Sequence, residues 1–265
     1  MQSHGLGDRD FCGKLLGRGL IHGFVHEIFS GIQGEGLFVG ERQIFVRLAG
    51  CNLECDYCDT AYSRETPEYC RAELTAGKRE FRMIQNPVSL EDMADVLSAL
   101  HSPSNLHHSV SITGGEPLVQ AEFARGIARH AKQIGLKVFL ETNGTLLDAL
   151  REILEFTDII SMDVKLGASR DLFALHKSFL EACVNHETYV KMVVTADSKT
   201  EDLDRGIDVI ASVDPGIPLI LQPVTPVSGV KSPTPERMLE WQARCKARLR
   251  SVRVIPQCHK LIGQL

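Results

Sequence analysis

The run Cys51-Asn52-Leu53-Glu54-Cys55-Asp56-Tyr57-Cys58 places three cysteines on one short segment. It follows an apolar stretch, Ile44-Phe45-Val46-Arg47-Leu48-Ala49, that ends at Gly50 and is typical of a buried strand. Three thiolates on one loop can hold three irons of a cubane [4Fe-4S] cluster, and the run has no fourth cysteine to complete the shell. We therefore expect Cys51, Cys55 and Cys58 to bind a cluster whose fourth iron is open to a substrate or cofactor.

A structural zinc site and disulfide bonds are the two alternatives for these cysteines. Zinc usually takes four ligands, so a zinc site would need Cys70 or a distant histidine, and the spacing differs from the paired C-x2-C of zinc ribbons. Disulfides would suit the even number of eight cysteines. However, we see no secretory signal pattern, and the chain is long enough to form a core without covalent links. We favour reduced thiols and a cytoplasmic location.

Composition and charge set mild bounds on the class of protein. With 265 residues, 43% of them hydrophobic, the chain can bury a sizeable core, and we expect one domain. A net charge of -5 gives no overall basic surface, so we expect no direct nucleic-acid partner. No apolar run approaches the roughly 20 residues that a membrane helix needs, so we expect no membrane association.

Apolar runs bounded by turn residues alternate with helix-patterned stretches, as in repeated β-α units around a parallel sheet. The pattern predicts helices over Ser89–Leu100, Gln120–Gln133 and Pro235–Leu249. We expect residues 1–22 to be a flexible extension and residues 23–265 to be one domain, in which 61–88 form an irregular insertion after the cysteine loop. The predicted strands cover residues 24–29, 43–49, 109–113, 136–141, 157–163, 188–194, 217–222 and 251–256.

Three polar motifs follow predicted strands, where α/β barrels place their chemistry. They are Thr113-Gly114-Gly115-Glu116-Pro117, Glu141-Thr142-Asn143-Gly144-Thr145 and Ser161-Met162-Asp163-Val164-Lys165. The two glycines of the first let a backbone approach a ligand closely, and Glu116 offers an acceptor for an ammonium group. Each motif alone could be an ordinary turn. Their repeated position at one edge of the sheet favours a shared site.

The C-x3-C-x2-C spacing, with Tyr57 before the last cysteine, resembles that of radical S-adenosylmethionine (SAM) enzymes. The resemblance implies an α/β fold, a modified partial (β/α)6-type TIM-like barrel with extra elements. It also implies that the cluster binds the methionine part of SAM and that cluster reduction releases a 5′-deoxyadenosyl radical. The residues that it assigns to the cofactor are Gly114, Gly115, Glu116, Glu141, Asn143, Asp163, Val164, Lys165, Gln222, Pro223, Val224 and Thr225.

A narrower resemblance starts at Ile28-Phe29-Ser30-Gly31-Ile32-Gln33-Gly34-Glu35-Gly36 and continues to Arg47. This segment is similar to the start of the 7-carboxy-7-deazaguanine synthase family of queuosine biosynthesis. The resemblance implies a lyase that contracts the ring of 6-carboxy-5,6,7,8-tetrahydropterin with loss of ammonia. A carboxylate suits a guanidinium fork, and a pterin's amide and amine edge suits glutamine and glutamate. The implied substrate contacts are Ile32, Gln33, Gly34, Glu35, Arg47, Thr113, His259 and Leu265.

The same resemblance implies further partners. It predicts a Mg²⁺ ion held partly by Thr60, which suits a hard ion that keeps several waters. It also predicts a homodimer and a flavodoxin- or ferredoxin-like electron donor. Cys258 stands where this family's pattern has threonine, and we assign no residue a catalytic role. The nearest alternative function is a glycyl-radical activating enzyme that acts on a protein partner, which would need a docking groove. The more distant one is a non-catalytic metal-binding scaffold, which would bind no cofactor.

Overall fold

A computed structural model describes residues 21–167, 171–227 and 229–264. Most of the expected N-terminal extension and the expected substrate contact Leu265 therefore lie outside the described residues. Within the described ranges, no helix is long and apolar enough to cross a membrane.

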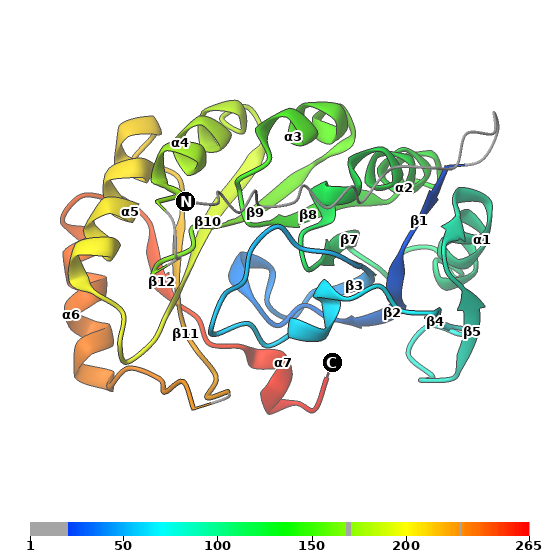
Figure 1. Cartoon of the computed structure of the whole chain (residues 1–265), viewed down its shortest axis with the longest axis horizontal. Coiled ribbons are helices and arrows are strands. Elements are labelled where there is room, and N and C mark those ends of the chain that lie inside the picture. Colours follow the sequence, from blue (N-terminus) through cyan, green and yellow to red (C-terminus); the bar gives the residue numbers. More distant parts are fainter. Residues whose placement is uncertain (1–20, 168–170, 228, 265) are drawn as a thin grey trace, which may run out of the picture.

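A ten-stranded sheet forms the frame of the molecule, in the order β12-β11-β10-β9-β8-β7-β3-β2-β4-β5 (Figure 1). The seven strands from β12 to β3 are parallel to one another, and β2 pairs antiparallel with β3. Each of the eight strand predictions overlaps one of these strands or β2. The sheet consists of β2 Val25–Ile32, β3 Arg42–Leu48, β4 Tyr69–Glu73, β5 Phe81–Gln85, β7 Ser109–Gly114, β8 Lys137–Thr142, β9 Ile159–Asp163, β10 Glu187–Val194, β11 Leu219–Pro223 and β12 Val252–Val254.

Six helices cover the outer face of this sheet, one after each of the six parallel strands from β3 to β11 (Figure 1). This is the expected open barrel of six β-α units. A seventh, short helix follows β12 and lies near the loop after β3. The helices are α1 Leu90–Leu100, α2 Ala121–Gln133, α3 Leu147–Ile153, α4 Phe173–Ala182, α5 Thr200–Val213, α6 Pro235–Lys246 and α7 Cys258–Leu261.

Local sequence explains where the helices begin and end. The Ser89 hydroxyl accepts a hydrogen bond of 3.0 Å from the Asp92 backbone N–H, which caps α1. Thr234 caps α6 in the same way, and Pro235 fits its first position because proline has no N–H to leave unbonded. Gly135, with φ +82°, ends the turn after α2 in a conformation that favours glycine. The helix predicted to reach Leu249 stops at Lys246.

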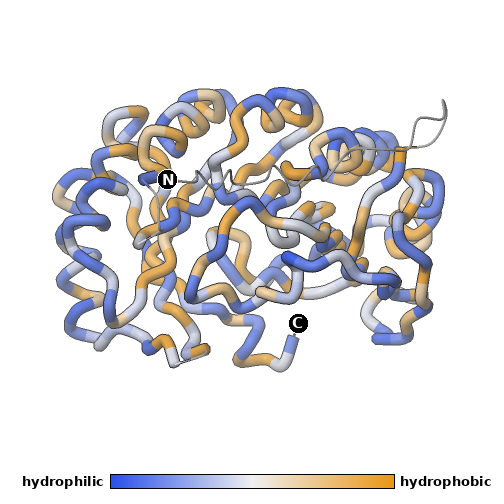
Figure 2. Tube along the Cα trace, in the orientation of Figure 1, coloured by the Kyte–Doolittle hydropathy of each residue, from blue (hydrophilic) through white to orange (hydrophobic). Residues whose placement is uncertain are grey.

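Two apolar clusters lie on opposite faces of the sheet. The larger one fills the space between the sheet and the helices, and apolar colour follows the strands and the inner sides of the helices in Figure 2. The smaller one consists of Phe139, Ile159, Tyr189 and Ile220, from four adjacent strands. These side chains fill the inside of the barrel, as layers of side chains do in closed barrels. They leave the carboxyl ends of the strands available for a pocket.

The expectation that residues 61–88 are irregular is wrong from Tyr69 onward. Strand β4 pairs in parallel with β2, and β5 pairs antiparallel with β4, so both extend the main sheet. A minor two-stranded sheet joins β1 His22–Gly23 to β6 Val88–Ser89. These strands were not predicted because the segment carries mixed charges. In β4, Arg71 and Glu73 alternate with the buried Cys70 and Ala72. The segment is therefore an integral edge of the sheet.

Candidate active site

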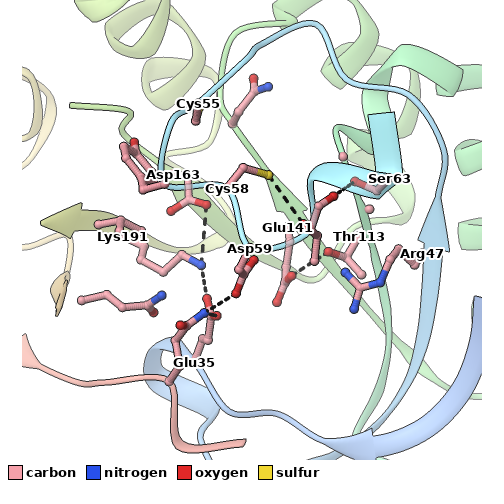
Figure 3. A pocket seen from close by; sticks show the side chains of 18 of the residues that line it. Glu35, Arg47, Cys55, Cys58, Asp59, Ser63, Thr113, Glu141, Asp163 and Lys191 are labelled. Atoms are coloured by element: carbon pink, nitrogen blue, oxygen red, sulfur yellow. Dashed lines mark hydrogen bonds and ion pairs between the residues drawn. The ribbon is translucent and has the colours of Figure 1, made fainter. Parts of the chain in front are cut away.

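One pocket opens at the carboxyl ends of the parallel strands, and it brings together most of the residues predicted from the sequence (Figure 3). They come from the carboxyl ends of β2, β3, β7, β8, β9 and β11, from the loops that follow these strands, and from α7. The predicted residues that line it are Ile32, Gln33, Gly34, Glu35, Arg47, Cys51, Cys55, Cys58, Thr60, Thr113, Gly114, Gly115, Glu141, Asn143, Asp163, Lys165, Gln222, Val224, Thr225 and His259.

The cysteine loop is fixed against the glycine turn after β7. The Glu116 N–H donates to the Gly50 carbonyl at 2.8 Å, and the Gly50 N–H donates to the Ser63 carbonyl at 2.7 Å. A Cβ on Gly115 would lie 2.3 Å from the Gly50 oxygen and 2.9 Å from Cys51 Cβ. Glycine is required here because the two backbones touch. The close backbone approach that we expected of this glycine turn is therefore made to the cysteine loop.

The donor set suits an iron-sulfur cluster. Three half-buried thiols of one loop face the same pocket, and thiolates are the usual ligands of such clusters. Burial raises the pKa values of Cys51 and Cys55 above that of a free thiol. Among the described residues, no three His, Cys, Asp or Glu side chains are gathered as a metal site. Cluster binding would therefore turn the three thiols toward a common point.

A hydrogen-bonded group forms one wall of the pocket. Glu141 accepts from Gln33 Nε2 at 2.9 Å and from Thr113 Oγ1 at 2.8 Å. Gln33 Nε2 also donates to Gln43 Oε1 at 3.1 Å.

Gly34 holds the loop after β2 against the C-terminal segment. Its carbonyl accepts from the Cys258 N–H at 2.8 Å, and a Cβ on Gly34 would meet His259 at 2.2 Å.

Arg47 lies at the other end of the same wall (Figure 3). Its Nε donates to Glu27 Oε1 at 2.9 Å, and the side chain is only 14% exposed. Within the described part of the chain, neither terminal nitrogen of Arg47 donates a hydrogen bond. A largely buried guanidinium with two unused terminal nitrogens suits recognition of a carboxylate.

Lys191 is a pocket residue that was not predicted from the sequence. Its Nζ forms ion pairs with Glu35 and, at 3.6 Å, with Asp163 (Figure 3). Asp163 also pairs with Lys165 at 2.9 Å. Burial alone would raise the pKa of Glu35, but the charge of Lys191 lowers it to about 2. Lys191 thus joins an expected substrate contact to an expected cofactor contact.

The C-terminal segment closes the pocket through two further residues, Gln257 and Lys260, to which no contact was assigned from the sequence. Gln257 Nε2 donates to Glu35 Oε1 and to Asp59 Oδ2, both at 2.7 Å. Lys260 Nζ donates to the same Asp59 oxygen at 2.8 Å. Asp59 thus ties the cysteine loop to α7, 201 positions away along the chain.

Three predicted cofactor contacts do not line the pocket: Glu116, Val164 and Pro223. Glu116 is fully buried and accepts from the N–H groups of Leu118 and Asn143, at 3.0 and 2.6 Å, and from Thr142 Oγ1 at 2.9 Å. It therefore braces the turn that carries Asn143.

The bracing role of Glu116 gives a first prediction. Glu116→Gln places an NH2 group among three donors, so at least one buried N–H loses its acceptor. We expect the free energy of unfolding to fall by about 1–3 kcal/mol, as for a buried donor left unpaired. Urea unfolding of the two proteins measures this difference. The exposed Glu152→Gln on α3 is the matched control and should change stability little. Equal stability of wild type and Glu116→Gln would contradict the role.

A cysteine loop on an open β-α barrel defines a class of enzyme, and the family comparison agrees. The Radical SAM superfamily model matches residues 46–193. The chain is therefore a radical SAM enzyme, a class whose cofactors are a [4Fe-4S] cluster and SAM.

Relatives define the family within this class. A 7-carboxy-7-deazaguanine synthase of Geobacter sulfurreducens is 40% identical over 246 residues, which cover 91% of this chain and 97% of the relative. A protein of the same name from Methanocaldococcus jannaschii is 34% identical over 91% of this chain and 100% of the relative. The chain belongs to the 7-carboxy-7-deazaguanine synthase family.

A solved structure supports the fold. Escherichia coli QueE has a TM-score of 0.59 to this chain, with 21% identity, and the match covers 90% of this chain and 95% of the other.

Proposed function

We propose that this chain converts 6-carboxy-5,6,7,8-tetrahydropterin to 7-carboxy-7-deazaguanine with loss of ammonia, as a radical SAM lyase of 7-deazapurine biosynthesis. The observation that carries this assignment is the position of Arg47. A largely buried guanidinium with two unused terminal nitrogens opens into the same pocket as the cysteine loop. The names of the full-length relatives support the same reaction.

The cofactor and substrate would occupy different parts of the pocket. The cluster and SAM together supply a 5′-deoxyadenosyl radical, and Cys51, Cys55 and Cys58 would hold the cluster. On this proposal the glycine turn at Gly115 and the Asn143 turn, both next to the cysteine loop, contact SAM. The Asn143 amide is held there by a 2.8 Å bond to Asn52.

Substrate recognition follows from the donors and acceptors of the opposite wall. Arg47 would bind the carboxylate through its terminal nitrogens, and Glu35 would accept from the pterin's amine and amide N–H groups. The hydrogen bonds that Gln33 and Thr113 donate to Glu141 fix the carboxylate of Glu141 beside them. The segment Pro256–Lys260 covers this wall and limits the access of water to a reactive radical.

Several partners belong to the same proposal. We propose that Thr60, which lines the pocket, contributes one ligand to a Mg²⁺ ion that also binds the substrate carboxylate. We propose a homodimer, a flavodoxin- or ferredoxin-like electron donor and a cytoplasmic location on the family likeness. Light scattering of the purified protein tests the dimer, which a monomeric mass would exclude.

An anaerobic assay tests the reaction. The protein with reconstituted cluster is mixed with reductant, SAM and 6-carboxy-tetrahydropterin, and 7-carboxy-7-deazaguanine is followed by mass spectrometry. The product would establish the substrate and the chemistry together. Formation of 5′-deoxyadenosine without the product would retain the radical SAM class and reject this substrate.

A second prediction concerns Arg47. Arg47→Lys keeps one charge but loses the planar fork, so the carboxylate loses a bidentate partner. We expect KM for the substrate to rise about tenfold or more, as for loss of a charged hydrogen bond. Binding of SAM should be unchanged, because Arg47 lies at the opposite wall. Steady-state kinetics and SAM titration measure the two effects. An equal loss of SAM binding would contradict the assignment.

A further inference from the structure

Three charged side chains link the edge of the sheet to the pocket. Arg71 on β4 donates from a terminal nitrogen to Glu27 Oε2 at 2.7 Å, and Arg47 on β3 donates from Nε to Glu27 Oε1 at 2.9 Å. The strands are in register at these positions, with Arg71 opposite Glu27 and Glu27 opposite Arg47. We call Arg71, Glu27 and Arg47 the charged row.

Glu27 is the central member of the charged row and is held in its ionised form. Its side chain is 9% exposed, against 14% for Arg47 and 41% for Arg71. Burial alone would raise the pKa of this carboxyl group, but the two arginines bring it below the ordinary value. The Tyr62 hydroxyl adds a longer contact of 3.4 Å to Oε1. A single buried anion thus binds two guanidinium groups.

The charged row determines how Arg47 faces the pocket. Because Glu27 takes the Nε donor, the planar guanidinium is fixed on one side, and its two terminal nitrogens remain for a ligand. A side chain held in this way loses less conformational freedom when it binds a carboxylate. We propose that Glu27 and Arg71 are positioning residues that orient Arg47 for the carboxylate of the tetrahydropterin substrate. This inference rests on the proposed function.

The inference also gives a role to the segment between the cysteine loop and α1. Strands β4 and β5 bring Arg71 beside Glu27, and the ring of Phe81 on β5 lies 4.5 Å from the guanidinium carbon of Arg71. A ring at this distance favours the cation energetically and limits its motion. The hairpin of β4 and β5 therefore contributes Arg71, a second positive charge that binds Glu27 in addition to Arg47.

Ligand binding to the cluster-loaded protein tests the inference. Anaerobic calorimetry with SAM present compares 6-carboxy-tetrahydropterin with the tetrahydropterin that lacks the carboxylate. We expect Glu27→Gln to weaken binding of the first ligand about tenfold, as for a lost charged hydrogen bond, and to leave the second unchanged. Arg71→Met should have a smaller effect of about threefold on the first ligand only, because Arg71 is partly exposed.

A neighbouring arginine supplies the matched control. Arg82 is exposed on β5 and pairs with Ala72, one position along from Arg71. Arg82→Met should therefore bind both ligands as the wild type does. Equal weakening of both ligands by Glu27→Gln, or equal effects of the Arg71 and Arg82 variants, would overturn the positioning role. A wild type that binds both ligands alike would overturn the proposed substrate, and this inference with it.

Discussion

Replacing Cys55 with serine is expected to abolish SAM cleavage while leaving the barrel folded. A serine oxygen is a harder and weaker ligand for cluster iron than a thiolate, and a loop with two remaining cysteines cannot hold three irons. Iron content and the formation of 5′-deoxyadenosine should both fall to the background of the cluster-free protein. Circular dichroism should change little, because Cys55 lies on a half-buried loop outside the two apolar cores.

Cys258 provides the matched control for this substitution. It is also half-buried, but it lies on α7, where its thiol donates to the Pro256 carbonyl at 3.4 Å. Cys258→Ser should keep the iron and the cleavage of SAM. Loss of iron in both variants would mean that general thiol chemistry, and not the spacing of the loop, determines cluster binding. Retention of iron in Cys55→Ser would remove Cys55 from the ligand set.

The barrel was predictable because its strands are buried on both faces. Such strands appear as short apolar runs, and the turns between them carry glycine and polar residues. The strand predicted over 109–113, for example, became β7 Ser109–Gly114. The cysteine loop was recognisable for a different reason: its three cysteines are local in sequence, and their spacing resembles that of radical SAM enzymes.

Lys191 was not predicted as a pocket residue because a single polar residue within an apolar strand was not considered as part of a site. Tyr189, Lys191 and Val193 alternate with the outward-facing Val190 and Met192, so period 2 places the lysine on the inner face of the barrel. That alternation was the available signal. The partners of Lys191 could not be predicted from the sequence. Glu35 lies 156 positions away, and local sequence patterns carry no information on such a pairing.

Glu116 and Asp59 show a second limit. Glu116 was predicted from its motif to contact the cofactor, and Asp59 was given no binding partner. In the structure, Glu116 bonds to the turn at Asn143, and Asp59 bonds to Gln257 and Lys260. A carboxylate in a motif has several donors within reach once the chain folds, and only the packing decides which of them it binds.

Lys191→Met is the second prediction with a large expected effect. Methionine keeps the length of the side chain but removes the charge that Glu35 and Asp163 share, and Lys191 is only 9% exposed. Removing one partner of a buried ion pair costs about 3–5 kcal/mol. We expect a loss of this order in the free energy of unfolding at neutral pH, together with weakened binding of both the substrate and SAM.

The pH dependence of this loss identifies its cause. Lys191 helps to lower the pKa of Glu35 from 4.5 to about 2, so the stabilisation is present above pH 4.5 and is lost as the pH falls toward 2. The difference between wild type and Lys191→Met should therefore shrink over this range. Urea unfolding at several pH values measures it, with Lys137→Met, an exposed residue at the start of β8, as the control. A difference that does not vary with pH would assign the loss to packing, and the link between Glu35 and Asp163 would then be incidental.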